Sequence, residues 1–159
     1  MTLRVLPSPT PAGASPSSAA AAEPSRWAEL RQCDPELRRQ VTAVRAWALG
    51  QGRAVEADAL TLVFAAARPG DWTEAKLTEL VWTGCWRCAH ALDEEAPAGV
   101  GEALWAALGW LASVDGLGPT AAPLPRLHAV LVANAGLDAQ GRARRSRSRP
   151  PAGPRRWAG

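Results

Sequence analysis

The sequence predicts an all-α fold, a compact bundle of about five helices with disordered N- and C-terminal extensions. Three observations lead to this prediction. Apolar residues recur at spacings of three and four through the middle of the chain, the period of an amphipathic helix. Residues that cap or end helices punctuate these stretches. The run Leu60–Phe64 is the one stretch that resembles a strand, and a single strand cannot satisfy its backbone hydrogen bonds.

Charge and composition divide the 159 residues into three zones. Residues 1–22 are rich in proline, serine and alanine and hold a single charge, Arg4. Residues 23–140 contain all fifteen acidic residues against ten basic ones, a net charge of −5. Residues 141–159 contain seven arginines and no acid, a net charge of +7. We therefore expect one helical domain over 23–140, because the two end segments have too few large apolar residues to form a core.

The first helices are predicted from their caps. Asp34 precedes Pro35, which is typical of an N-cap followed by proline at the first helical position. This helix ends at Gly50, and a short helix over 27–32, capped by Ser25, leads into it. Its inward stripe recurs at spacings of four, three and four: Leu37, Val41, Val44 and Ala48.

Four further helices follow along the chain. One spans 55–68 and ends at Pro69-Gly70. The next spans about 73–92, with Asp71 and Glu74 in the positions of a capping box. The last two cover 98–114 and 123–134, and Gly136-Leu137 resembles a glycine C-cap with its hydrophobic contact.

Cys85-Trp86-Arg87-Cys88 is the one motif with chemical potential. A redox pair needs its first cysteine at a helix N-terminus, and this pair lies about three turns into a predicted helix. A zinc site needs four ligands. On a helical projection His90 points away from both sulfurs, so the other ligands would be Cys33 and His128 from separate helices. We therefore interpret Cys85 and Cys88 as small apolar core residues, and we expect no metal and no cofactor.

The chain has eight tryptophans, one phenylalanine and no tyrosine. Trp82 and Trp86 lie four residues apart on the 73–92 helix, opposite its main apolar stripe. Because this helix is apolar over most of its circumference, we expect it to lie at the centre of the bundle with both rings packed. The alternative is that Trp82 and Trp86 form a docking patch for a protein partner, since tryptophan is enriched at interface hot spots.

The C-terminal segment is basic and of low complexity. One interpretation is a solvated extension that reflects an arginine-rich composition, with seventeen arginines and one lysine in the chain. The other is an electrostatic arm for nucleic acid or another acidic surface. The residues that would supply those contacts are the arginines of this segment: Arg142, Arg144, Arg145, Arg147, Arg149, Arg155 and Arg156.

Motif searches favour a function without catalysis. The chain lacks phosphate-binding, dinucleotide-binding, serine-hydrolase and zinc-protease motifs, and Asp93-Glu94-Glu95 is interpreted as a solvated loop. Residues 41–64 have the layout of a helix-turn-helix, but the second helix opens with Glu56 and Asp58, which phosphates would repel. No apolar run is long enough for a membrane span, and prolines interrupt any secretory signal, so a cytoplasmic location is expected.

The sequence therefore predicts a non-enzymatic helical protein-interaction or regulatory module with a protein partner. The alternative is a small accessory protein that binds nucleic acid without sequence specificity through its arginine-rich C-terminal segment.

Overall fold

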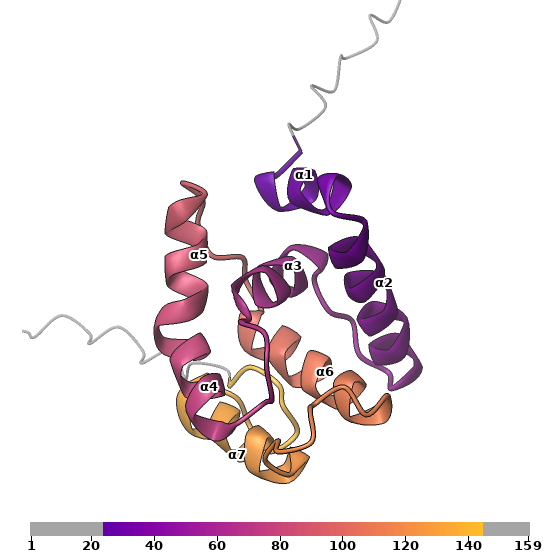
Figure 1. Cartoon of the computed structure of the whole chain (residues 1–159), viewed down its shortest axis with the longest axis vertical. Coiled ribbons are helices and arrows are strands. Elements are labelled where there is room, and N and C mark those ends of the chain that lie inside the picture. The colour runs from indigo at the N-terminus through magenta and orange to yellow at the C-terminus, as the bar shows by residue number, and fades with distance from the viewer. Residues whose placement is uncertain (1–23, 145–159) are drawn as a thin grey trace, which may run out of the picture.

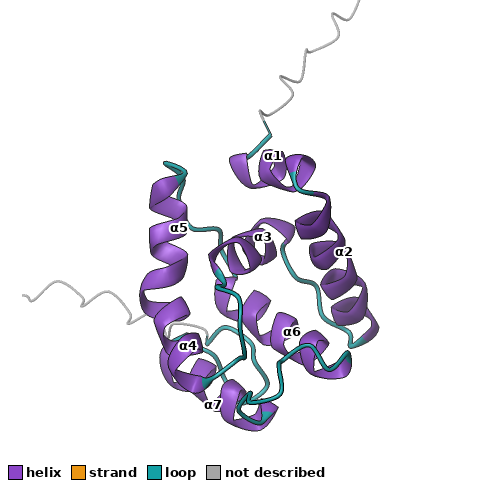
Figure 2. Cartoon of the chain, in the orientation of Figure 1, coloured by secondary structure: helices purple, strands orange, loops and turns teal. Residues whose placement is uncertain are grey.

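Within residues 24–144, which the computed structural model describes, the regular secondary structure is entirely helical (Figure 2). An isolated bridge between Leu137 and Ala143 is the sole extended pairing in this range. The elements are α1 (Arg26–Cys33), α2 (Pro35–Gly50), α3 (Ala57–Ala66), α4 (Glu74–Glu79), η1 (Leu80–Gly84), α5 (Cys85–Ala91), α6 (Val100–Ser113) and α7 (Leu124–Asn134). The segments α4, η1 and α5 follow one another without a break. The all-α prediction is confirmed, and the Leu60–Phe64 run is helical.

The centre of the bundle is α3. Five consecutive side chains, Ala59–Val63, have no exposed area. Figure 1 shows α3 in the middle of the molecule, and it packs against α1, α2, α5 and α6. The prediction that the 73–92 helix is central is therefore wrong. That helix has a wide apolar circumference because its tryptophans count as apolar, whereas the middle of α3, Ala59–Val63, is covered on every side.

A polar network attaches α1 to this buried helix. The carboxylate of Asp58 accepts a hydrogen bond from Ser25 Oγ at 2.7 Å and from Arg31 Nη1 at 2.6 Å. Arg31 Nη1 also donates to the hydroxyl of Thr61 at 2.7 Å, and that hydroxyl donates to the Ala57 carbonyl. Thr61 is fully buried. Its hydroxyl thus has partners on both helices, which removes the cost of burying an unpaired polar group.

The helix starts follow the predicted caps with one exception. Ser25 Oγ accepts from the Ala28 amide, and Asp34 Oδ1 accepts from the Glu36 and Leu37 amides. The exception is the start of α4, where the hydroxyl of Thr73 caps the helix through the Lys76 amide. The predicted cap, Asp71, instead accepts hydrogen bonds from the amide and hydroxyl of Thr120. Asp71 therefore links the loop before α4 to the loop before α7. These hydrogen bonds lower the pKa of its carboxyl group.

The segment η1 is a π-helical turn inside the α4–α5 helix. Its wider hydrogen bond runs from the Cys85 amide to the Leu80 carbonyl, five residues apart. Leu80 and Cys85 are consequently both buried, where a regular helix would bury residues three or four apart. Cys85 is buried, and Cys88, three residues further along the helix, is half-buried.

The packed region continues to Arg144, four residues beyond the predicted end of the helical domain. Gly136 takes a left-handed conformation with a φ of 66°, and Leu137 is buried after it, as the predicted C-cap requires. Arg53 donates to the carbonyls of Gln140 and Gly141 at 2.7 Å. Residues 135–144 therefore return across the end of α6 and belong to the folded unit.

Two helices approach closely where Gly109 of α6 meets Trp47 of α2. A Cβ atom built on Gly109 would lie 2.5 Å from the Trp47 indole. We expect Gly109→Ala to lower the free energy of unfolding by about 1–3 kcal/mol, because the clash outweighs the better helix propensity of alanine. Urea unfolding followed by circular dichroism measures this change.

Gly50→Ala is the matched control, because nothing lies within 4 Å of a Cβ at Gly50. We expect this variant to equal or exceed the wild-type stability by up to about 1 kcal/mol. A Gly109→Ala variant that is more stable than the wild type would contradict the packing described for α2 and α6.

Candidate functional site

Trp82 and Trp86 lie on the surface of the molecule. Their side chains are 64% and 63% exposed. The expectation that both rings are packed in the core is therefore wrong, because α3 occupies the central position and α5 packs on it along one side only. The other strongly exposed large apolar residues in the described chain, Leu49 and Val114, lie at the ends of α2 and α6.

Neighbouring side chains orient both indoles. Trp82 Nε1 donates to Asn134 Oδ1 at 3.0 Å, so this ring extends from η1 towards the C-terminal end of α7. The Asn134 amide nitrogen in turn donates to the Val130 carbonyl. Trp86 stacks on His90, with ring centroids 5.2 Å apart and planes within 5°. We call Trp82, Trp86 and His90 the indole face.

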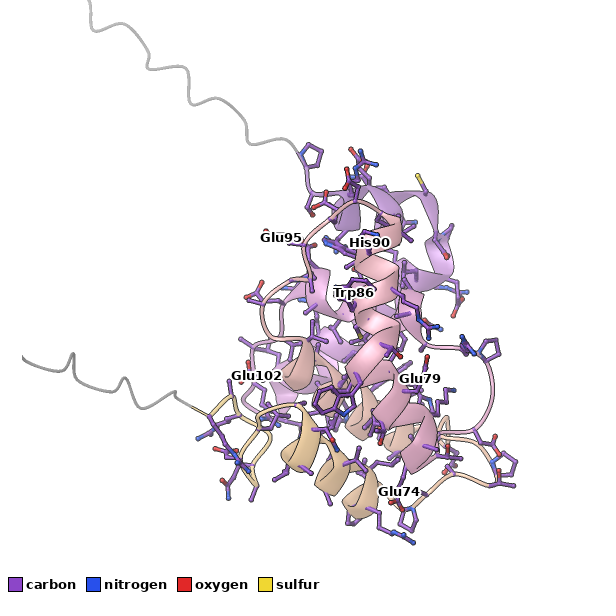
Figure 3. The ribbon with its side chains drawn as sticks, turned by 90° about the vertical axis from the view of Figure 1, so that its left-hand side faces the viewer. Glu74, Glu79, Trp86, His90, Glu95 and Glu102 are labelled. Carbon is purple, nitrogen blue, oxygen red and sulfur yellow. The ribbon has the colours of Figure 1, made fainter. Side chains whose placement is uncertain are left out.

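Two acidic side chains lie near the indole face. Figure 3 shows Trp86 and His90 along α5, with Glu79 beyond the Trp86 end of the pair and Glu95 to one side of His90. Glu79 forms an ion pair with Arg87. Glu95 forms no ion pair with any residue of 24–144. The surroundings of the two tryptophans therefore combine exposed apolar area with the Glu79–Arg87 ion pair and the carboxylate of Glu95, which has no ion pair among residues 24–144.

The two cysteines of the C-x-x-C motif line the inner side of the same helix. Cys85 is buried, as predicted for a core residue, and Cys88 is half-buried. Burial, followed by the charges of Cys88 and Glu79, raises the pKa of the Cys85 thiol to about 12. Burial also raises the pKa of Cys88. In residues 24–144 no group of three or more potential ligands is placed to hold a metal ion.

Two of the predicted contact arginines, Arg142 and Arg144, fall in the described part of the chain. Both side chains are exposed, and Arg144 Nε donates to the Leu137 carbonyl at 2.7 Å. The remaining five lie outside the described residues: Arg145, Arg147, Arg149, Arg155 and Arg156. The helix-turn-helix layout fails on burial, because its second helix would be α3, whose residues Ala59–Val63 are fully buried and cannot contact a DNA groove.

A feature that the sequence did not predict is a cavity of about 620 Å³ that is open to solvent and lies between α6, α7 and the last described residues; all its lining residues are half-buried or exposed. Its aliphatic lining includes Leu124, Ala129 and Val132. Trp105, which also lines the cavity, stacks on His128 with ring centroids 3.6 Å apart and planes within 9°. No sequence signal could have found this cavity, because it forms only when residues 137–144 return to α6.

His128 is the polar group beneath this cavity. Its Nε2 atom is shielded from solvent and has no hydrogen-bond partner within the described chain. Burial lowers the pKa of His128, the positive charge of Arg53 lowers it further, and a hydrogen bond with the Trp105 backbone opposes both. The imidazole is therefore neutral at pH 7.

Comparisons with protein families, with curated proteins and with solved structures find no match to this chain. None of the helices among residues 24–144 has the length and apolar character needed to cross a membrane. A functional interpretation therefore rests on the indole face and the cavity.

The difference in exposure between the cysteines is testable by alkylation. At pH 8 we expect iodoacetamide to modify Cys33, which is exposed, and to leave Cys85 unmodified. A pKa of about 12 lowers the thiolate fraction of Cys85 about a thousandfold relative to its ordinary value of 9.0. Peptide mapping by mass spectrometry identifies the modified residues, and denaturation in urea should expose all three. Native Cys85 that reacts as fast as Cys33 would contradict its burial.

The lowered pKa of His128 predicts how stability changes with pH. The unfolded chain binds a proton at His128 more readily than the folded chain, so the stabilising contribution is lost as pH falls below about 6.5. We expect the free energy of unfolding to decrease from pH 7 to pH 5, as measured by urea unfolding. His128→Gln should reduce this decrease, whereas His90→Gln, which changes an exposed histidine, should retain it. An equal pH dependence in the wild type and His128→Gln would contradict the account.

Proposed function

We propose that this protein is a non-catalytic interaction module whose indole face docks a basic, partly apolar segment of a protein partner. The exposure of Trp82 and Trp86 on one side of a single helix is the observation that carries the proposal. Two large aromatic side chains of this kind offer a contiguous apolar contact surface, and tryptophan is enriched among the residues that dominate binding energy.

The indoles are held before a partner binds. The Trp82–Asn134 hydrogen bond and the Trp86–His90 stacking restrict both rings, so association loses less side-chain entropy than it would with free rings. Trp82 also lies within the π-helical segment, a rare irregularity that frequently occurs at functional sites. These features support a recognition role over an incidental exposure of two apolar side chains.

The carboxylates near the indole face indicate which kind of partner segment it would bind. Two carboxylates lie near the indole face: Glu79, which pairs with Arg87, and Glu95, which forms no ion pair among residues 24–144. An arginine or lysine of the partner would meet both a carboxylate and the face of an indole, which attracts cations. A basic segment with interspersed apolar residues therefore fits this surface better than an acidic one.

Binding of nucleic acid through the C-terminal arginines is the alternative predicted from the sequence. Five of those seven arginines lie outside the described residues, and the other two, Arg142 and Arg144, are exposed. No observation on the described residues favours this alternative, so it stays a prediction.

A peptide-display selection tests the docking proposal. A library of random 16-residue peptides is selected on the immobilised full-length protein, and the enriched peptides are synthesised. We expect them to contain arginine or lysine together with apolar residues. Trp82→Ala and Trp86→Ala should each weaken their binding by about tenfold or more, because each removes an aromatic side chain that the bound peptide would cover. Fluorescence anisotropy measures the dissociation constants.

Leu49→Ala is the matched control, since Leu49 is 71% exposed and lies on α2, away from the indole face. This variant should bind the selected peptides as the wild type does, and all three variants should keep their helicity. Selected peptides of acidic composition, or peptides that bind Trp82→Ala and Trp86→Ala with unchanged affinity, would overturn the proposal.

A further inference from the structure

The cavity between α6 and α7 is a second candidate site and is built from residues outside the indole face. Its volume of about 620 Å³ falls in the range of cavities that bind small molecules, roughly 300–1,000 Å³. Its walls are mostly aliphatic, with the Trp105–His128 stack on one side. A ligand that fills it must therefore be largely apolar.

One guanidinium lines this apolar cavity, that of Arg144. Two backbone carbonyls hold it in place, Leu137 through Nε at 2.7 Å and Val132 through Nη2 at 3.4 Å. Neither contact uses Nη1, and no carboxylate of residues 24–144 forms an ion pair with Arg144. Arg144 is thus a solvent-exposed cation without an ion-pair partner among residues 24–144, and its contacts with the Leu137 and Val132 carbonyls place it at the edge of the apolar cavity.

The start of α7 and the guanidinium of Arg53 add positive electrostatic potential near the Arg144 edge of the cavity. The cavity lining includes Leu124 and Pro125 at the start of α7, where the N-cap residue Pro123 provides no side-chain hydrogen bond. The N-terminal end of a helix carries a partial positive charge. The guanidinium of Arg53 lies 5.8 Å from the Trp105 ring centroid. The nearby carboxylates of Asp138 and Glu102 accept backbone hydrogen bonds within the 138–143 turn and do not line the cavity.

We infer that this cavity binds an apolar small molecule that carries one carboxylate, with the carboxylate on Arg144 and the apolar body against Leu124, Ala129 and Val132. A guanidinium matches a carboxylate in shape and donates charge-assisted hydrogen bonds to it. A single negative charge suits the site because one unneutralised guanidinium lines it. Binding at this site requires no contact with Trp82 or Trp86.

A pair of probes that differ only in charge tests this inference. The full-length, ¹⁵N-labelled protein is titrated with 2-naphthoate and, separately, with its neutral analogue 2-naphthamide. We expect saturable chemical-shift changes at Trp105, His128 and Arg144, with 2-naphthoate binding about tenfold or more tightly than 2-naphthamide because of the charge-assisted hydrogen bonds. Isothermal titration calorimetry provides an independent dissociation constant.

Matched variants test the Arg144 contact and the apolar part of the cavity separately. Arg144→Ala should make the affinities of the two probes equal, whereas Arg142→Ala, which removes a neighbouring charge outside the cavity lining, should preserve the difference. Ala129→Phe fills the cavity and should abolish saturable binding of both probes. Ala75→Phe introduces the same ring at another exposed alanine, on α4, and should leave binding unchanged.

Several results would overturn the inference. The absence of saturable shifts with either probe would show that the cavity is no binding site, as would shifts confined to another face of the molecule. Equal affinities of 2-naphthoate and 2-naphthamide for the wild type would remove the assignment of a carboxylate. Unchanged binding to a folded Ala129→Phe variant would place the probe outside the cavity.

Discussion

The enclosure of the middle of α3, Ala59–Val63, on all its sides is the constraint on which the rest of the bundle depends. A ten-residue helix with five consecutive fully buried side chains needs packed neighbours around its whole circumference. Four helices provide them, and α1 also provides polar partners for Asp58 and Thr61. Burial of this kind is the main favourable term in folding, so the other helices take positions that cover α3.

This arrangement determines which surfaces are free for recognition. Because α3 fills the centre, the α4–η1–α5 helix has an inner side with Leu80 and Cys85 and an outer side with Trp82 and Trp86. The cavity arises differently, where the chain returns from Gly136 across α6 and brings Arg144 to α7. One surface is thus set by helix packing, and the other by the turn that follows the last helix.

Most of the local structure could be predicted from the sequence because caps and periodicity act over a few residues. Ser25, Asp34 and Gly136 end or begin helices through contacts with their own neighbours. The position of the central helix could not be predicted in this way, since tryptophan counts as apolar whether it is packed or exposed. The π-helical turn and the Arg144 contacts also left no periodic signal, because both depend on tertiary packing.

Native-state hydrogen exchange measured by NMR tests the central position of α3 most directly. The account predicts that the amides of residues 60–66 are the slowest in the molecule and exchange only through global unfolding. The amides of η1 and α5 should exchange earlier, through local opening of a helix with one solvent-facing side. Protection that is greater in residues 80–91 than in α3 would contradict the account, because it would place the tryptophan-bearing helix at the centre of the bundle.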